Sequence, residues 1–260
     1  MYIKPYDELT IQDNFIFQKV MRNKRICKQT IERLLDIDIK DISYPEEEKS
    51  INVRLDSRSI RLDVYVNDDK GTVFNIEMQT TKDMDELVKR TRYYQGLIDI
   101  DNIEKGQNYS ALHDIYIIFI CTFGVFTGKR HKYTFRNLCI EDNEILLNDG
   151  TTKLFLSTKG EADDVSKPLK MFLDYVDGKK PEDALMQEID HEVDTVKHCD
   201  EWRRDYMTLA LEMDKKWREG KAEGKIEAIR NAIKDGLTTL AAVKKSGRYT
   251  EEEIAAIAAP

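Results

Sequence analysis

The feature that most constrains this chain is a pair of alternating segments separated by a short polar loop. In residues 60–66 and again in 73–79, every second residue is apolar, which is the pattern of a strand with one buried face. The loop at 67–71 ends in glycine, so the two segments are predicted to form an antiparallel β-hairpin. A further alternating segment at 51–55 precedes them, and the three together predict a three-stranded antiparallel meander.

Helical and buried segments surround this meander. Apolar residues recur at helical spacing over 11–36, with a break expected at Asn23, and again over 83–99 and 166–178. A continuous apolar run at 115–123 predicts a strand that is covered on both faces. The predicted fold class is therefore α/β, and weaker strand signals follow at 132–140 and 144–156.

The composition changes near residue 182. From there to about 234 the chain is rich in Ala, Glu, Lys, Arg and Leu, which is typical of a long solvated helix, and two short helices are predicted after Gly236. We therefore expect a core over 1–180, a helical extension over 181–234 and a small helical tail over 235–260.

The charge balance excludes a protein that holds nucleic acid by bulk basicity. Lys and Arg number 41 against 49 Asp and Glu, for a net charge of −8 over 260 residues, so any basic surface must be local. Four cysteines without a Cys-x-x-Cys pair are typical of a reducing compartment. The first residues carry acids instead of an apolar leader, and the most apolar run is far shorter than the ~20 residues that span a membrane. We expect a soluble, cytoplasmic protein with no membrane partner.

The hairpin is expected to bring two acidic residues together. If Leu62 and Val64 face the core, Asp63 faces the other way, and counting across the loop places Glu77 roughly opposite it. Opposed residues in an antiparallel pair have Cβ atoms ~4.5–5.5 Å apart, so the two carboxylates could share a hard cation such as Mg²⁺. Polar residues on the outer face of a half-exposed sheet explain the same pattern without any ligand, and the alternation alone leaves both interpretations open.

The residues around these acids resemble the PD-(D/E)XK nuclease superfamily and, more narrowly, the group of recombination-promoting nucleases and transposases. The resemblance spans about 7–257 and depends on the order and spacing of several short pieces. These pieces are Arg61-Leu62-Asp63-Val64, Ile76-Glu77-Met78-Gln79, the helix Lys89-Arg90-Thr91-Arg92-Tyr93-Tyr94-Gln95, the opening Asp13-Asn14-Phe15-Ile16-Phe17 and a Glu-Gly-Lys-rich segment from 219.

The resemblance implies a restriction-endonuclease-like core: a helix, a three-stranded meander, a helix and a further strand. It implies that Asp63 and Glu77 are catalytic residues that hold Mg²⁺ or Mn²⁺, with Asp13 as an additional candidate from the first helix. Gln79 stands where the superfamily usually has Lys, and a neutral amide can only form hydrogen bonds. Some of the charge stabilisation would then rest on the metal or on a neighbouring cation such as Lys89 or Arg90.

The activity that the resemblance implies is Mg²⁺-dependent hydrolysis of DNA phosphodiester bonds by an endonuclease linked to recombination or mobile elements. A metal-generated hydroxide would attack the phosphorus, and Glu77 or Gln79 would help to place the water. Lys89, Arg90 and Arg92 are expected to contact DNA phosphates, and Tyr93 either stacks on a base or packs in the core. The basic run at 129–132 is expected either to touch the duplex or to form a plain surface turn.

Two other functions fit the sequence. One is a catalytically weak or inactive DNA-binding, transposase-related protein that acts through its helical C-terminal region, and the other is an assembly or toxin–inhibitor component that acts through 200–260. The tail resembles a helix-turn-helix, but its second helix begins Thr250-Glu251-Glu252-Glu253, which would repel phosphates and instead forms a capping box. We therefore expect Ile254 and Ile257 to contact a partner, or the C-terminal helices to form a homo-oligomer.

Overall fold

The computed structural model describes residues 3–44, 50–51 and 60–259. The chain divides into two compact units: Asp7–Cys199, and Met1–Tyr6 together with Asp200–Pro260. The domain boundaries at 180 and 234 that the composition suggests stay predictions.

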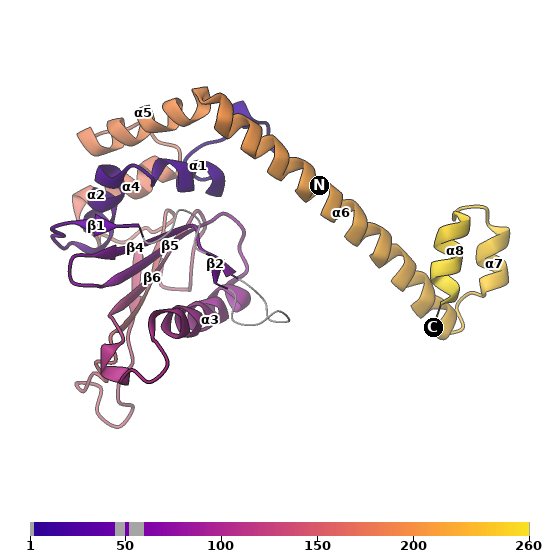
Figure 1. Ribbon diagram of the computed structural model, residues 1–260, viewed down its shortest axis with the longest axis horizontal. Coiled ribbons are helices and arrows are strands. Elements are labelled where there is room, and N and C mark those ends of the chain that lie inside the picture. Colours follow the sequence, from indigo (N-terminus) through magenta and orange to yellow (C-terminus); the bar gives the residue numbers. More distant parts are fainter. Residues whose placement is uncertain (1–2, 45–49, 52–59, 260) are drawn as a thin grey trace. The chain divides into compact units, whose positions relative to one another are not determined.

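The first unit is built on a six-stranded sheet with the order β1-β4-β5-β6-β8-β7 (Figure 1). Strands β5, β6 and β8 run parallel, and the others are antiparallel to their neighbours. The strands are β1 (Ile42–Ser43), β4 (Val64–Asp68), β5 (Val73–Gln79), β6 (Ile115–Cys121), β7 (Lys132–Phe135) and β8 (Thr151–Ser157).

The predicted hairpin is present, but its first strand begins at Val64 and not at residue 60. Strand β4 pairs with β5, with Val64 opposite Ile76, and the loop turns at Gly71, whose φ of 85° suits a residue without Cβ. The outer strand of the meander is different from the prediction. The second neighbour of β4 is β1, whereas β2 (Ser50–Ile51) and β3 (Ile60–Arg61) pair with each other in a separate two-stranded sheet. Most of the strand expected at 51–55 lies outside the described residues.

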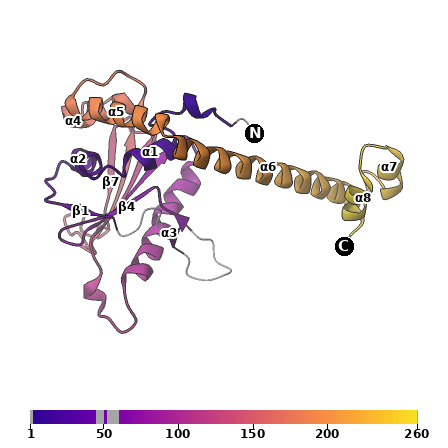
Figure 2. The same cartoon turned by 45° about the horizontal axis from the view of Figure 1, so that its top comes forward.

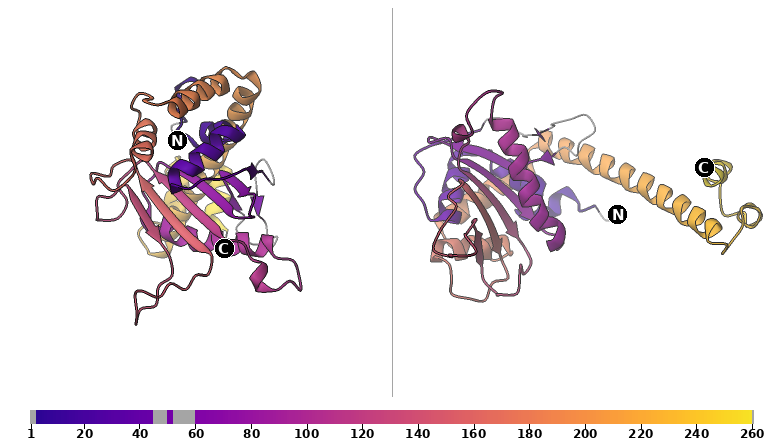
Figure 3. Two further views of the ribbon diagram at one scale, coloured as in Figure 1. Left: turned by 90° about the vertical axis from the view of Figure 1, so that its left-hand side faces the viewer. Right: turned by 90° about the horizontal axis from the view of Figure 1, so that it is seen from below.

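Helices cover both faces of the sheet (Figures 1 and 3). The break expected at Asn23 is confirmed, because its side chain accepts a hydrogen bond from the N–H of Ile26 and caps the second helix. One face carries α1 (Asn14–Val20), α2 (Lys24–Leu35), α4 (Lys167–Val176) and α5 (Ala184–His198), while α3 (Met84–Asn102) lies on the other. Two short 3-10 helices are η1 (Tyr6–Glu8) and η2 (Tyr109–Ala111).

The core explains the continuous apolar run in β6. Beneath α3, Phe119 of β6 packs with Tyr94 of the helix and Phe155 of β8. The alternate residues of β6, such as Ile118, are equally buried on the opposite face. A strand in this position has no solvated side, so it shows no alternation.

The second unit contains α6 (Asp200–Lys234), α7 (Leu240–Lys245) and α8 (Glu251–Ala258), with α8 packed on α6 and on α7 (Figure 2). The predicted capping box is confirmed between Thr250 and Glu253. Ile257, which we expected to contact a partner, is instead buried within this unit. No described helix combines the length and the apolar character needed to cross a bilayer.

Candidate active site

Asp63 is tied to Glu77 and to the next residue, Met78, by one hydrogen bond each. The N–H of Asp63 donates to Oε1 of Glu77 over 3.1 Å, and the N–H of Met78 donates to Oδ2 of Asp63 over 3.1 Å. Asp63 occupies a bend between β3 and β4, where the β4–β5 pairing has ended. Its carboxylate therefore takes a strand N–H that regular pairing would otherwise satisfy, and this holds the two acids side by side.

Gln18 on α1 is a member of the site that the sequence analysis did not identify. Its Nε2 donates to Oδ1 of Asp63 over 2.8 Å. The signal available in the sequence was an amide side chain directly after the apolar residues 15–17 of the predicted helix. Asp13, the additional candidate, accepts hydrogen bonds from the N–H and the hydroxyl of Thr10 through its Oδ2. Its role as a metal ligand stays a prediction.

Arg90 on α3 contacts both Gln79 and Glu77. Its Nη1 donates to Oε1 of Gln79 over 3.0 Å, and its Nη2 lies 3.3 Å from Oε2 of Glu77. The same Nη2 donates to the hydroxyl of Tyr94 over 2.7 Å, and the guanidinium lies over the rings of Tyr94 and Phe119. A fixed positive charge thus stands beside Gln79, in the place where the superfamily motif would supply Lys.

The neighbouring helix residues are arranged differently from Arg90. Lys89, Arg92 and Tyr93 are exposed on α3, so Tyr93 does not pack in the core, a role that Tyr94 fills. Their contact with DNA stays a prediction.

The basic run at 129–132 is mostly engaged within the protein. His131 is buried, and its Nδ1 lies 3.0 Å from Oδ1 of Asp164. Lys132 donates from Nζ to the carbonyl of Leu34, and Lys129 pairs with Glu161. Two of its side chains, His131 and Lys132, therefore tie the start of β7 to other parts of the unit. Lys129 and Arg130 are exposed, and their contact with DNA stays a prediction.

The electrostatics of the site favour a cation. Burial is the main cause that raises the pKa of Glu77 well above its usual value, the charge of Asp63 raises this pKa further, and Arg90 opposes both. The side chain of Glu77 is only 2% exposed, against 25% for Arg90. A second positive charge between the acids would relieve the repulsion that remains.

The donor set fits a magnesium-sized ion. Each carboxylate oxygen has more than one acceptor position, so the hydrogen bonds described above leave further lone pairs. Over the described ranges, no cluster contains three or more His, Cys, Asp or Glu side chains able to hold a metal. Mg²⁺ is usually bound by one or two carboxylates, with waters and substrate phosphates completing its shell, which Asp63 and Glu77 satisfy.

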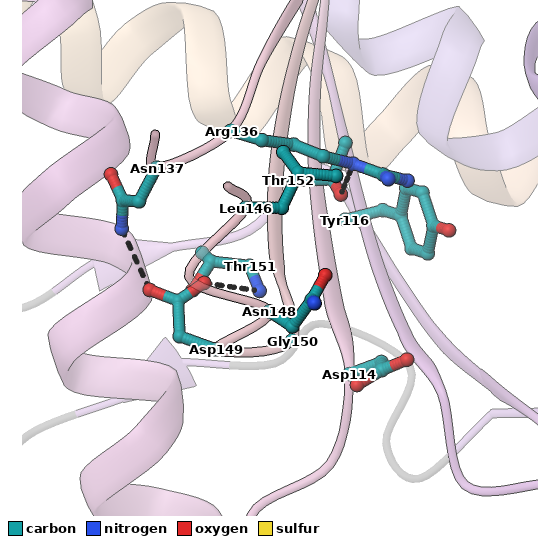
Figure 4. A pocket seen from close by; sticks show the side chains of 10 residues that line it. All are labelled: Asp114, Tyr116, Arg136, Asn137, Leu146, Asn148, Asp149, Gly150, Thr151 and Thr152. Carbon is teal, nitrogen blue, oxygen red and sulfur yellow. Dashed lines mark hydrogen bonds between the residues drawn. The ribbon is translucent and has the colours of Figure 1, made fainter. Parts of the chain in front are cut away.

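A separate polar cavity of about 160 Å³ lies at the other end of the sheet (Figure 4). Asp149, on its wall, accepts hydrogen bonds from Asn137 and from the N–H of Thr151. Arg136 donates to the hydroxyl of Thr152. This cavity is where β6 and β8 begin, whereas Glu77 and Gln79 lie near the end of the parallel strand β5, so it is not part of the site.

Comparison with known protein families identifies the family of this chain. No curated protein and no solved structure matches the chain. A family model described as PD-(D/E)XK nuclease family transposase matches residues 14–158, more than half of the 260 residues, and its span contains Gln18, Asp63, Glu77, Gln79 and Arg90. The chain therefore belongs to the PD-(D/E)XK nuclease family transposases.

Proposed function

We propose that this protein is a Mg²⁺-dependent DNA endonuclease that acts in recombination or on mobile elements. The observation that carries the proposal is the convergence of Asp63 and Glu77 beside Arg90. The N–H of Asp63 donates to Oε1 of Glu77, and Oδ2 of Asp63 accepts from the N–H of Met78. This arrangement concentrates two anions and one cation at the end of β5. Free thiols at Cys27 and Cys121 support a reducing, cytoplasmic location.

Each residue has a distinct task in the proposed site. Asp63 and Glu77 would hold Mg²⁺ or Mn²⁺, which when bound polarises a phosphoryl oxygen and lowers the pKa of a coordinated water. Gln79 uses its amide oxygen for Arg90, which leaves its NH₂ group to donate to a water or to a phosphate oxygen. Arg90 would stabilise the negative charge that develops on the phosphate during hydrolysis.

The exposed side of α3 is the proposed DNA contact. Lys89, Arg92 and Tyr93 lie on the helix that supplies Arg90, so a DNA backbone that reaches Arg90 would pass close to them. Lys and Arg contacts to phosphates supply sequence-independent affinity, which compensates locally for the negative net charge of the chain.

Cleavage of supercoiled plasmid tests the proposal. Wild-type protein with Mg²⁺ should nick the plasmid, and Asp63→Asn and Glu77→Gln should each lower the rate at least about 100-fold, because each removes one of two metal-binding charges. Glu104→Gln, which changes an exposed carboxylate after α3, is the matched control and should retain full activity. Equal cleavage by wild type and both site variants would show that the activity does not come from these residues.

The second candidate is a catalytically weak or inactive DNA-binding protein that acts through its helical C-terminal region. The ion pair between Arg90 and Glu77 favours it, because it neutralises a carboxylate that the metal would need. This function predicts that DNA binds with equal affinity in Mg²⁺ and in EDTA, while no nicking above that of Glu77→Gln is detected.

Self-association of the C-terminal helices is compatible with both proposed functions. Met207, Leu211 and Trp217 are exposed along α6, in a part of the helix where the structure describes no buried side chain. We propose that a second copy of α6 covers them.

A further inference from the structure

A row of aromatic residues leads across the sheet from the proposed active site. Glu77 on β5 is in register with Phe119 on β6, which is in register with Phe155 on β8. All three lie on the face that α3 covers, and the rings of Phe119 and Phe155 stack at 5.5 Å. Since neighbouring strands are ~4.8 Å apart, Phe155 lies about 10 Å from Glu77 along this row.

The row ends in a cavity with aromatic walls. Its volume is about 260 Å³, and its lining includes Phe126, Phe135 and Phe155, with Val88 and Thr91 from α3. Phe155 is buried at its base, whereas Phe126 is 40% exposed and Phe135 43% exposed. The three ring centroids are 5.2–5.8 Å from one another. Two large rings thus remain open to solvent on a buried aromatic base.

The backbone at Phe126 is held in an unfavourable conformation. Its φ is +51°, in the left-handed region that bulky residues rarely adopt. Such conformations persist where the surrounding structure enforces them, and they cluster at binding and catalytic sites. Here the result is a ring within 5.0–5.3 Å of Tyr133, Phe135 and Phe155 that still faces solvent.

A positive charge borders the cavity. Lys153 lines it, is in register with Phe135 of β7, and is half-buried. Asp99 on α3 interacts electrostatically with Lys153, but among the described residues no salt bridge joins the two side chains. A cation beside exposed rings suits a ligand that is flat and apolar at one end and anionic at the other.

We propose that this cavity binds one unpaired nucleobase of the DNA substrate, with Lys153 directed to the adjoining phosphate. The inference rests on the proposed function and narrows its substrate class to DNA with single-stranded or distorted segments. Bases stack on aromatic side chains in single-strand binding, whereas the bases of an intact duplex present no free face. The cavity is smaller than the ~300–1,000 Å³ of ordinary ligand pockets, which suits a single planar ring system.

Binding in EDTA tests the proposal without any cleavage. The probes are a fluorescein-labelled 15-nucleotide single strand and the same sequence as a duplex, titrated with full-length protein. Phe135→Ala should weaken single-strand binding about tenfold, as expected for the loss of one base stack, and leave duplex binding unchanged. Tyr109→Ala, which removes a tyrosine that is 82% exposed outside the cavity, is the matched control and should change neither affinity.

A second variant tests the proposal even if Phe135→Ala fails to fold. Phe135→Trp retains an aromatic ring and should show fluorescence quenching when the single strand binds, beyond the wild-type signal from Trp202 and Trp217. Absence of extra quenching, an equal loss for both probes with Phe135→Ala, or no DNA binding at all would overturn the proposal. Because nicking is measured separately, a protein that cuts DNA but shows no effect at Phe135 would contradict this inference alone.

Discussion

Gln18 donates a hydrogen bond from its side-chain amide to Oδ1 of Asp63, across 45 residues of sequence. This contact fixes the orientation of an acid that lies in a bend, outside any regular strand. Helix α1 thus reaches the candidate active site and helps to position it.

Gln18→Ala should lower the nicking rate about tenfold, equivalent to ~1.4 kcal/mol, because Asp63 loses one of the bonds that orient it. The Mg²⁺ concentration needed for half-maximal rate should rise as well, which a purely structural defect would not cause. The measurement is plasmid nicking across a Mg²⁺ titration. Gln187→Ala, an exposed glutamine on α5, is the control, and a wild-type Mg²⁺ dependence for Gln18→Ala would contradict the positioning role.

Arg90→Met should move the rising limb of the pH–rate profile to higher pH. Burial and Asp63 raise the pKa of Glu77, and Arg90 is the cation that opposes them, so its removal raises this pKa further. Arg90→Lys should shift the limb less because it keeps the charge, while Arg92→Met, an exposed change on the same helix, should not shift it. A profile for Arg90→Met that falls in height but keeps its wild-type midpoint would argue against this coupling.

The raised pKa of Glu77 should also make the free energy of unfolding fall as pH rises. Glu77 has a raised pKa in the folded protein, so its contribution to stability is complete below its ordinary pKa and is lost as pH rises through the raised value. Glu77→Gln has no charge to desolvate, so its free energy of unfolding should fall less than that of wild type over this window. Urea unfolding at a series of pH values measures the difference, and parallel curves would refute it.

Mg²⁺ should raise the melting temperature of wild-type protein but not that of Glu77→Gln. An ion that binds only the folded state stabilises it, by about 2.7 kcal/mol at a concentration of 100 Kd. Differential scanning fluorimetry with Mg²⁺ and with matched ionic strength of Na⁺ separates specific binding from screening. Glu104→Gln should respond as wild type does, and a uniform response in all three proteins would mean that the ion binds elsewhere.

Leu211→Glu should convert an assembled protein to monomer if α6 is the interface. This side chain is 71% exposed on α6, and a charge there cannot be buried against a second helix. Light scattering after size-exclusion chromatography gives the mass of each form. Glu212→Gln, at a neighbouring exposed position, should leave the mass unchanged, and a monomeric wild type would exclude the interface.

Local patterns predicted much of the core because they act over short distances. The alternation at 60–79 predicted the β4–β5 pairing, and the loop position alone placed Asp63 near Glu77. The cap at Asn23 was also readable, because capping needs only a polar side chain before an apolar helix.

Long-range contacts escaped sequence analysis for a physical reason. Whether β4 pairs with β1 or with an earlier strand depends on which partner the whole sheet can cover, and nothing near residue 42 records that choice. Gln18 reaches the site through the packing of α1, which periodicity predicts only as a helix with an inner face. Arg90 was one of two candidates for a cation beside Gln79, and the packing of α3 decides between it and Lys89. Basic residues therefore look alike in the sequence, although Arg90 is bound to Glu77 while Arg92 faces solvent.

The ion pair between Arg90 and Glu77 gives the site a cation even when no metal is bound. Because a guanidinium lies 3.3 Å from the buried carboxylate, we expect the chain to fold without a metal. Chelation should therefore silence the protein reversibly and leave it intact, and returning Mg²⁺ should restore it at once without refolding. Under the proposed function, the protein would be folded but inactive whenever free magnesium is scarce.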